Sequence, residues 1–524
     1  NYISANYTHA FRDFMAVGSN LVAQMVSKRT IDGQEMFSLS CNSDVTLDVA
    51  KEMREQQRKG RKIGIIAEIN QNLPFMYGDA LVEPGLFTDV VDNPDYTTRL
   101  FSAPKMTISE TDFLIGLYAS GLIKDGGTLQ IGIGSLGDAL IYGLKLRQTE
   151  NPVYQEALEA SQTMQRFGET IESTGGTEVL EEGLYGCTEM FVDGYLELLR
   201  SGIVKRKVYD NVAIQRLVNE GKINEKITGS SLEALLEDRA ISPWLSKDNL
   251  EFLQDYGILK KNCSIDEKEH VIRCGDVEIP NDLRDRQNLD TLIENGLGDK
   301  LDKGFIVHGG FFLGPESFYR ELHEMTEEER KRIHMTSVLR VNQLYRNEYG
   351  SEELKLLQRA HGRFVNACLM VTLNGSVCSD ALENGKVVSG VGGQYNFVSQ
   401  AHALPDGRSI LMCRSTRMTG GQPKSNIVYN YGNITIPRHL RDIIITEYGI
   451  ADLRSKSDQE VIAALINVTD SRFQEELLRR AKSEGKIPDS YQIPDIHRNN
   501  TPERIRDILT PFKERGYFTP FPFG

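Results

Sequence analysis

The sequence lacks the cysteine pattern of a disulfide-stabilised protein. Its 524 residues contain seven cysteines at scattered spacings, with no C-x-x-C pair. This predicts reduced thiols and no disulfide framework, as in a cytoplasmic protein. No apolar run approaches the roughly 20 residues of a membrane helix, and no signal peptide is recognisable at the start. We therefore expect a cytoplasmic protein without a membrane partner. The chain begins at Asn1 without methionine, so the sequence leaves open whether the native N-terminus is present.

Positive charge is also in deficit. Lys and Arg number 60 against 74 Asp and Glu, a formal net charge of −14. This balance argues against a nucleic-acid partner and against an anionic membrane surface. The nine histidines show no metal-ligand spacing, so we predict no metal site. No G-x-S-x-G elbow accompanies His308-Gly309-Gly310, which excludes a serine esterase.

The stretch that organises the rest runs from Val365 to Phe397. Val365–Leu373 is apolar and β-branched, which predicts one buried strand. Asn374-Gly375 then predicts a two-residue hairpin turn, with Ser376–Ser379 as the returning strand. In that register Met370 lies opposite Ser379, and Asp380 points to the other face.

A glycine-rich loop follows the hairpin, at Gly390-Val391-Gly392-Gly393-Gln394. Glycines let backbone N–H groups come close to a ligand and point at negative charge. A buried strand beside such a loop suits acyl-transfer chemistry, because the developing oxyanion needs fixed donors. The amides around Gly392 and Gly393 are the candidate donors.

A second glycine loop follows a short strand near residue 130. Gly132, Gly134 and Gly137 fit G-x-G-x-x-G, and Ser135 lies between them. The pattern alone would indicate a dinucleotide site. However, no acidic residue ends a second strand about 20 positions further on, so we do not predict NAD.

Several blocks together give the chain a resemblance to the acetyl-CoA hydrolase/transferase family, the CoA-transferases that include the 4-hydroxybutyrate and acetate enzymes. Family members carry G-V-G-G-Q-x-D-F where this chain has Gly390 to Phe397, with Asn396 in place of the aspartate. Other similar blocks are Glu68 to Pro74, Asp125 to Asp138, Gly186 to Gly194, Phe312 to Tyr319 and Ile445 to Arg454.

The resemblance implies an enzyme that transfers or hydrolyses a short acyl group held as a coenzyme A thioester. In such enzymes a glutamate attacks the thioester carbonyl and passes through an anhydride to an enzyme-bound CoA thioester. Here Met370 occupies the glutamate position, and a thioether forms no anhydride. The catalytic group is therefore unassigned. Glu189 and Glu383 stay open as substitute carboxylates, and His402 and Glu447 as the base for hydrolysis by a water at the glycine loop. The alternative is a regulatory CoA-binding homologue without activity.

The resemblance also implies the remaining features of the site and the assembly. The CoA-binding and oxyanion residues would be Gly390, Gly392, Gly393, Gln394 and Asn396, and the substrate cleft would hold Gly132, Gly134, Ser135 and Glu189. Acyl-CoA and a small carboxylic acid would be the substrates, without metal or NAD. A homodimer is the expected assembly.

Alternating strands and helices predict an α/β fold with mostly parallel sheets. We expect two related open α/β domains of the CoA-transferase type with a cleft between them. The N-terminal domain would span residues 1–300, with insertions near 146–180 and 210–300. The C-terminal domain would span residues 301–524.

Overall fold

The computed structural model describes residues 3–523. Contacts divide the chain into two compact units. The larger unit holds residues 1–206, 306–344 and 359–524, and the smaller unit holds residues 207–305 and 345–358. The smaller unit spans nearly the same residues as the insertion expected at 210–300. The domain boundary near residue 300 stays a prediction.

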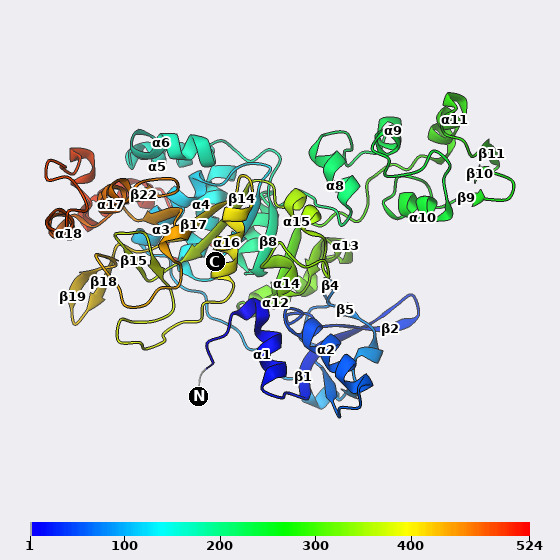
Figure 1. The fold of residues 1–524 in the computed structure, drawn as a ribbon, viewed down its shortest axis with the longest axis horizontal. Coiled ribbons are helices and arrows are strands. Elements are labelled where there is room, and N and C mark those ends of the chain that lie inside the picture. Colours follow the sequence, from blue (N-terminus) through cyan, green and yellow to red (C-terminus); the bar gives the residue numbers. More distant parts are fainter. Residues whose placement is uncertain (1–2, 524) are drawn as a thin grey trace. The chain divides into compact units, whose positions relative to one another are not determined.

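Nine strands of the described residues form the central sheet of the larger unit (Figure 1). Its order is β22-β21-β17-β14-β7-β8-β12-β13-β4. Every neighbouring pair is parallel except β21 and β22. The α/β prediction is therefore confirmed. The strands are β4 Tyr77–Gly78, β7 Thr128–Ile131, β8 Tyr185–Met190, β12 Val307–Phe311, β13 Ile333–Met335, β14 Gly362–Ala367, β17 Arg408–Met412, β21 Ile443–Thr446 and β22 Gly449–Asp452.

The strand order reverses direction between β7 and β14. From β7 the chain adds β8, β12 and β13 on one side, and then returns to add β14, β17 and β21 on the other. In open α/β sheets, ligands bind outside the carboxyl ends of the strands at such a reversal. The topology therefore singles out the carboxyl ends of β7 and β14 before any side chain is considered.

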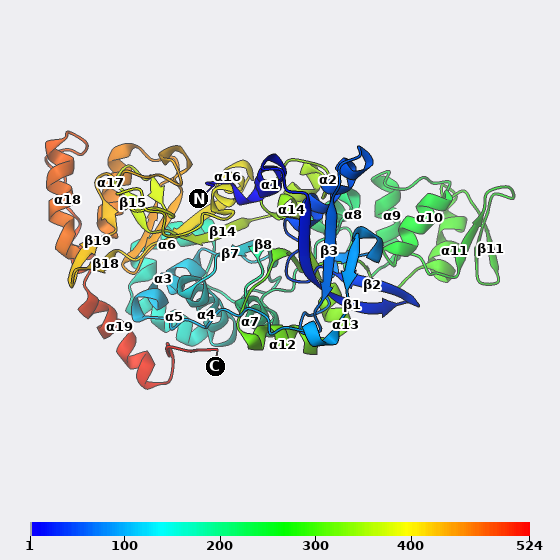
Figure 2. The ribbon, with the colours of Figure 1, turned by 90° about the horizontal axis from the view of Figure 1, so that it is seen from below.

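Helices cover both faces of this sheet. Figure 2 shows α3, α4 and α7 on one side and α14 and α16 on the other. Their starts follow local capping chemistry: Ser109 and Asp112 form a capping box at α3, and Ser457 and Glu460 form one at α17. The larger unit's helices are α1 Ala10–Ala16, α2 Thr46–Arg58, α3 Glu110–Gly121, α4 Ser135–Thr149, α5 Asn151–Ala160, α6 Thr163–Thr174, α7 Gly194–Arg200, α12 Glu316–Glu324, α13 Glu327–Lys331, α14 Val338–Val341, α16 Gln394–Ala403, α17 Asp458–Asn467, α18 Ser471–Ser483 and α19 Pro502–Glu514.

Three smaller sheets complete the larger unit. One has the order β5-β2-β1-β3-β6, one β16-β15-β20, and one pairs β18 with β19. No helix among residues 3–523 is both long and apolar enough to cross a membrane. The strands are β1 Leu21–Ile31, β2 Gln34–Ser38, β3 Gly64–Ile69, β5 Leu81–Val82, β6 Asp89–Val91, β15 Met370–Thr372, β16 Val377–Cys378, β18 Thr416–Thr419, β19 Gln422–Ser425 and β20 Ile427–Val428.

The expected single strand from Val365 to Leu373 is wrong, because the chain changes sheets within it. The N–H of Cys368 still donates to Met412 of the central sheet, at 2.9 Å. The next N–H, that of Leu369, donates to Cys378 in the small sheet, also at 2.9 Å. An apolar run shows that both segments are buried but carries no signal for the exchange of partners.

The predicted hairpin register is also wrong, by one residue. Met370 pairs with Cys378 rather than with Ser379. Of the two turn residues, only Gly375 has a positive φ, of 87°. A two-residue Asn-Gly turn needs positive φ at both positions, whereas a three-residue loop needs it only at the glycine. The loop is therefore Leu373 to Gly375, and Asp380 falls in line with the face of Met370.

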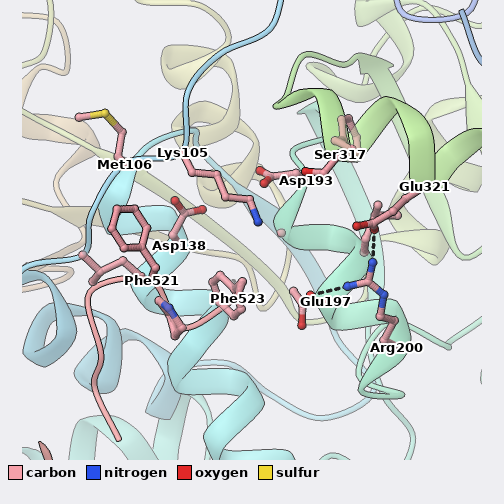
Figure 3. A pocket seen from close by; sticks show the side chains of 15 residues that line it. Lys105, Met106, Asp138, Asp193, Glu197, Arg200, Ser317, Glu321, Phe521 and Phe523 are labelled. Atoms are coloured by element: carbon pink, nitrogen blue, oxygen red, sulfur yellow. Dashed lines mark hydrogen bonds and ion pairs between the residues drawn. The ribbon is translucent and has the colours of Figure 1, made fainter. Parts of the chain in front are cut away.

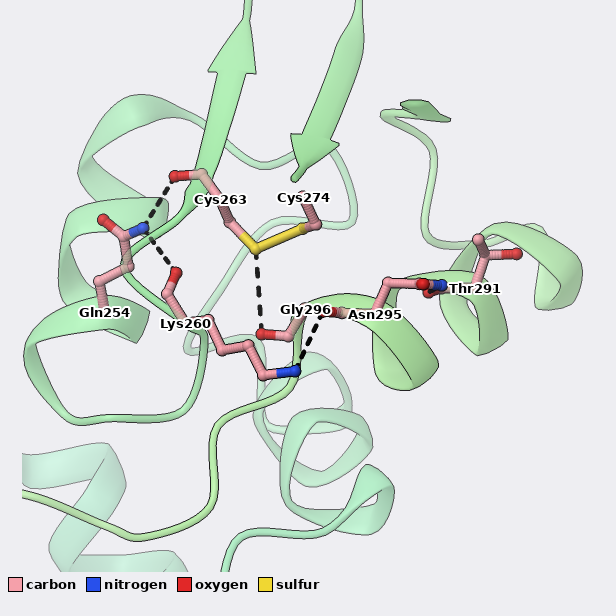
Figure 4. Close-up of a disulfide and its surroundings, with 7 residues drawn as sticks. All are labelled: Gln254, Lys260, Cys263, Cys274, Thr291, Asn295 and Gly296. Carbon is pink, nitrogen blue, oxygen red and sulfur yellow. Dashed lines mark hydrogen bonds between the residues drawn. A yellow bond between two sulfur atoms is a disulfide. The ribbon is translucent and has the colours of Figure 1, made fainter. Parts of the chain in front are cut away.

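The smaller unit has its own hydrophobic cluster and a three-stranded antiparallel sheet, in the order β11-β10-β9. Cys263 and Cys274 lie opposite each other on β9 and β10 and form a disulfide, with Cα atoms 4.2 Å apart (Figure 4). The prediction that all cysteines are reduced is wrong for this pair, because strand pairing joins positions that the spacing does not reveal. The elements are α8 Val212–Asn219, α9 Gly229–Glu237, α10 Lys247–Asp255, α11 Arg286–Gly296, α15 Glu352–Gln358, β9 Cys263–Asp266, β10 Val271–Cys274 and β11 Val277–Pro280.

Replacing Cys263 by serine is expected to lower the unfolding free energy of the smaller unit by about 3 kcal/mol, because the disulfide no longer restricts the unfolded chain between residues 263 and 274. Hydrogen exchange of amides in residues 207–305 of the full chain measures this loss. Amides of the central sheet serve as the internal control. Equal protection of the smaller unit in the variant and the wild type under oxidising conditions would contradict the expectation.

Candidate functional site

Both glycine loops meet at the carboxyl end of β14. The N–H of Gly132, just after β7, donates to the carbonyl of Val365 at 2.9 Å. The side-chain amide of Gln394, at the start of α16, donates to the carbonyl of Ala367 at 2.8 Å. Strand β14 therefore holds the two loops side by side at the reversal point of the sheet.

The first loop enters α4 through a glycine with a positive φ. Gly134 has a φ of 115°, which side chains rarely adopt. Ser135 follows, and its hydroxyl accepts a hydrogen bond from Arg414 at 3.0 Å. The guanidinium of Arg414 is in turn fixed by the buried carboxylate of Asp112. Ser135 is thus held by a buried ion pair, and its place in a substrate cleft stays a prediction.

Glu189 is the carboxylate that the structure brings to the second loop. It lies near the end of β8, which is next to β7 in the sheet. A Cβ built on Gly392 would lie 2.8 Å from its Oε1, and one built on Gly393 would lie 2.2 Å from its Oε2. The side-chain amide of Asn342 donates to Oε2, and the backbone of Gly393 also hydrogen-bonds the carboxylate. These glycines therefore leave room for a carboxylate.

Burial raises the pKa of Glu189 from 4.5 to about 7. The hydrogen bonds from Asn342 and Gly393 oppose this rise, and the negative charge of Asp44 adds to it. The side chain keeps partial exposure to solvent. A carboxyl group with a pKa near 7 and some access to solvent is suited to proton transfer or nucleophilic attack at neutral pH.

A cavity of about 660 Å³ has Tyr7 and Asp44 in its lining, although neither Glu189 nor a glycine loop lines it. The Tyr7 hydroxyl donates to Asp44. Burial raises the pKa of Tyr7, and the negative charges of Asp44 and Glu189 add to the rise. Asn342 also donates to Thr8 at 3.0 Å. The volume is in the range of small-ligand pockets.

Three buried amide oxygens at this place have no hydrogen-bond partner among the described residues. They are Oδ1 of Asn342, Oε1 of Gln394 and Oδ1 of Asn396. Buried polar atoms usually have partners, so unsatisfied acceptors mark a place for a donor from outside the chain. Gln394 and Asn396 were predicted as binding residues, whereas Asn342 carries no motif and was missed.

Other predicted or open candidates lie elsewhere. Gly390 is exposed, and a Cβ there would meet nothing within 4 Å, so the structure does not bring it to Glu189. Met370 is buried, with its sulfur 3.3 Å from Nη1 of Arg417. His402 contacts the carbonyl of Leu440.

Two further carboxylates near the C-terminal motifs, Glu447 and Asp380, have hydrogen-bond partners of their own. Glu447 is buried and accepts a hydrogen bond from the N–H of Ser415 at 2.7 Å. Asp380 accepts one from the hydroxyl of Thr435 at 2.6 Å. Neither contacts Gly392 or Gly393 in the way Glu189 does.

A separate pocket lies against α4 and α7 (Figure 3). Burial and the charge of Asp193 raise the pKa of Asp138 to about 7. Arg200 is ion-paired with Glu197 and Glu321. The lining includes Phe521 and Phe523 but neither glycine loop nor Glu189, so this pocket is not part of the site at the sheet edge.

Residues 314–481, which include the hairpin, the second glycine loop and Glu447, match the family described as acetyl-CoA hydrolase/transferase C-terminal domain. Over this segment the chain is similar to the C-terminal domain of that family, and the matched segment spans about a third of the chain. The resemblance drawn from the sequence blocks is thereby confirmed.

Relatives of this family extend the similarity beyond the matched segment. The 4-hydroxybutyrate coenzyme A transferase of Clostridium kluyveri is 21% identical over 443 residues, covering 84% of this chain and 69% of the relative. A probable butyrate:acetyl-CoA coenzyme A-transferase of Syntrophomonas wolfei is 36% identical over 121 residues, covering 22% and 27%.

Solved structures share the fold. RipA from Yersinia pestis superposes with a TM-score of 0.57 at 19% identity, over 93% of this chain and 76% of that one. The 4-hydroxybutyrate CoA-transferase from Porphyromonas gingivalis gives a TM-score of 0.52 at 17% identity, over 91% and 79%. At this identity they support the α/β fold alone.

Proposed function

We propose that this protein binds a short-chain acyl-CoA and transfers its acyl group to or from a small carboxylic acid, or hydrolyses the thioester. The observation that carries the proposal is the closure of the Gly392–Gly393 loop on a carboxylate at the reversal point of the sheet. A carboxylate and fixed amide donors at one point are what acyl transfer from a thioester requires.

The surroundings of that point support the same chemistry. The cavity beside Tyr7 and Asp44 offers room for an acyl group or a pantetheine arm. The unpartnered amide oxygens of Asn342, Gln394 and Asn396 can accept hydrogen bonds from amide N–H groups, which pantetheine carries. The remaining elements of the proposal, a homodimer and substrates without metal or NAD, rest on the family resemblance.

A second candidate is a CoA-binding homologue that does not turn over its ligand. It is favoured by Met370, which occupies the position of the family glutamate and contacts Arg417 through its sulfur. In this candidate the site binds acyl-CoA but contains no nucleophile.

Incubation with acetyl-CoA and propionate distinguishes the candidates. We expect propionyl-CoA to form at a rate above that of a buffer control, as followed by mass spectrometry of the CoA thioesters. Release of free CoA without exchange would identify a hydrolase. Binding of acetyl-CoA by calorimetry without either product would favour the homologue without turnover. Absence of binding would refute the proposed function.

A further inference from the structure

We propose that Glu189 is the nucleophile of this protein and takes over the role that a glutamate at position 370 would have. The inference rests on the proposed function, because it names the residue that carries the covalent intermediate. It assigns a catalytic role to a residue on β8 of the central sheet, whereas Met370 lies on the hairpin of a separate, smaller sheet.

Geometry is the first argument. A nucleophile and its oxyanion donors must share one carbonyl group, so the nucleophile has to lie against the glycine loop. Glu189 does: its two oxygens occupy the space beside Gly392 and Gly393. Asn342 holds Oε2, and Oε1 lies beside Gly392 and is not bound by Asn342. The carboxylate is therefore oriented with one oxygen fixed.

The surroundings of Met370 give the second argument. Its side chain is 4% exposed and packs on a small sheet with Cys378 opposite. Nη1 of Arg417 lies 3.3 Å from its sulfur and also donates to Asn426 at 2.7 Å. Nothing at this position attacks a thioester, since a thioether is only a weak acceptor.

Asn342 supplies the third argument. It is fully buried, and its amide nitrogen is used by Glu189 and Thr8 while its oxygen has no partner among the described residues. A buried amide oxygen without a partner is unfavourable for the fold. Because the other end of the same amide donates to the carboxylate, we assign Asn342 as a positioning residue for Glu189.

The reaction follows from these placements. Oε1 of Glu189 bonds to the thioester carbonyl carbon, the carbon–sulfur bond breaks, and CoA leaves as its thiolate. The thiolate then attacks Cδ of the mixed anhydride, and the acyl group leaves as a carboxylate. Glu189 is now a CoA thioester, and an incoming carboxylate reverses both steps. No electrons or protons are gained or lost overall.

The two donors on Glu189 fit the second step. When the thiolate attacks Cδ, negative charge develops on the remaining oxygen of Glu189 itself. That charge is received by the Asn342 amide and the Gly393 backbone, which already bind the carboxylate in the free protein. Donors that need no rearrangement are the effective ones in stabilising an oxyanion.

The experiment is to trap the intermediate in the full-length protein. The protein is mixed with acetyl-CoA, treated with borohydride to reduce an enzyme thioester to an alcohol, digested, and mapped by mass spectrometry. We expect the reduced residue to be Glu189. Glu189→Gln is expected to show no modification and to lose at least about 1000-fold in acetyl-CoA/propionate exchange, as variants of covalent nucleophiles do.

The matched control is Glu197→Gln on α7, which replaces a partly buried carboxylate outside the site by the same amide. It is expected to keep both the modification and the exchange. Asn342→Ala, in turn, is expected to lower kcat about 100-fold with little change in the KM for acetyl-CoA. A KM change of similar size would point to a merely structural role for Asn342.

Failure of this inference differs from failure of the proposed function. Modification of another residue, exchange that survives Glu189→Gln, or thiol release without any adduct would overturn the role of Glu189 while acyl-CoA chemistry stands. Failure of the wild-type protein to bind acetyl-CoA would overturn both.

Discussion

Replacing Gly393 by alanine is expected to lower acyl-CoA turnover by about 100-fold or more, with the fold intact. The new methyl group would lie 2.2 Å from Oε2 of Glu189 and 2.6 Å from Nδ2 of Asn342. Both side chains must move, which breaks the hydrogen bond that orients the carboxylate. The φ of Gly393 is −88°, which alanine adopts without strain, so the backbone gives no reason for unfolding. Steady-state acetyl-CoA/propionate exchange measures the turnover, and circular dichroism measures whether the fold is intact.

Two further glycine-to-alanine variants make this test specific. At Gly85 in the N-terminal region a Cβ would meet nothing within 4 Å, so Gly85→Ala is the neutral control. Gly390 belongs to the same loop as Gly393, but its Cβ would also meet open space. Gly390→Ala is therefore expected to cost at least about ten times less activity than Gly393→Ala. Equal losses in both loop variants would mean that the loop acts by flexibility rather than by contact with Glu189.

The elements that sequence patterns predicted well are those governed by local chemistry. Helix α3 begins at the capping box of Ser109 and Asp112, and α17 begins at that of Ser457 and Glu460, both patterns of residues three positions apart. The glycine loops at 132 and 392 could be recognised because close approach of backbone is a property of glycine itself. Such signals need only a few neighbouring residues.

The errors arose where a distant partner decides the outcome. The register of the hairpin depended on whether Asn374 takes a positive φ as well as Gly375, and only Gly375 does. The exchange of sheets after Cys368 depended on which carbonyls accept from the backbone, that of Met412 for Cys368 and that of Cys378 for Leu369. The sequence block around Glu189 indicated a cleft residue. Its contact with Gly393 exists because β8, β7 and β14 are neighbours, and strand order is a non-local property.

Glu189→Gln is expected to be more stable than the wild type at pH 8, by about 1–3 kcal/mol in unfolding free energy. The pKa of Glu189 rises from 4.5 to about 7 in the folded protein. The folded state therefore binds the proton more tightly than the unfolded state does. Between these two pH values wild-type stability falls as pH rises, and above about 7 the full cost of the buried charge is present. A neutral glutamine carries no such cost.

The difference between the two proteins is therefore expected to shrink as pH falls and to vanish near pH 4.5, in urea unfolding followed across this range. Asp44, whose pKa burial raises to about 6, lies in the same cluster as the Tyr7 hydroxyl. Both groups are present in the wild type and in Glu189→Gln, so the difference in unfolding free energy between these two proteins removes most of what Asp44 and Tyr7 contribute to the pH dependence. Glu197→Gln should give the opposite sign at pH 8, because it breaks ion pairs with Lys145 and Arg200. A Glu189→Gln protein less stable than the wild type at pH 8 would mean that the carboxylate is there for structure. A gain in stability together with loss of exchange would mean that the fold tolerates an unfavourable charge at the one place where the proposed chemistry needs it.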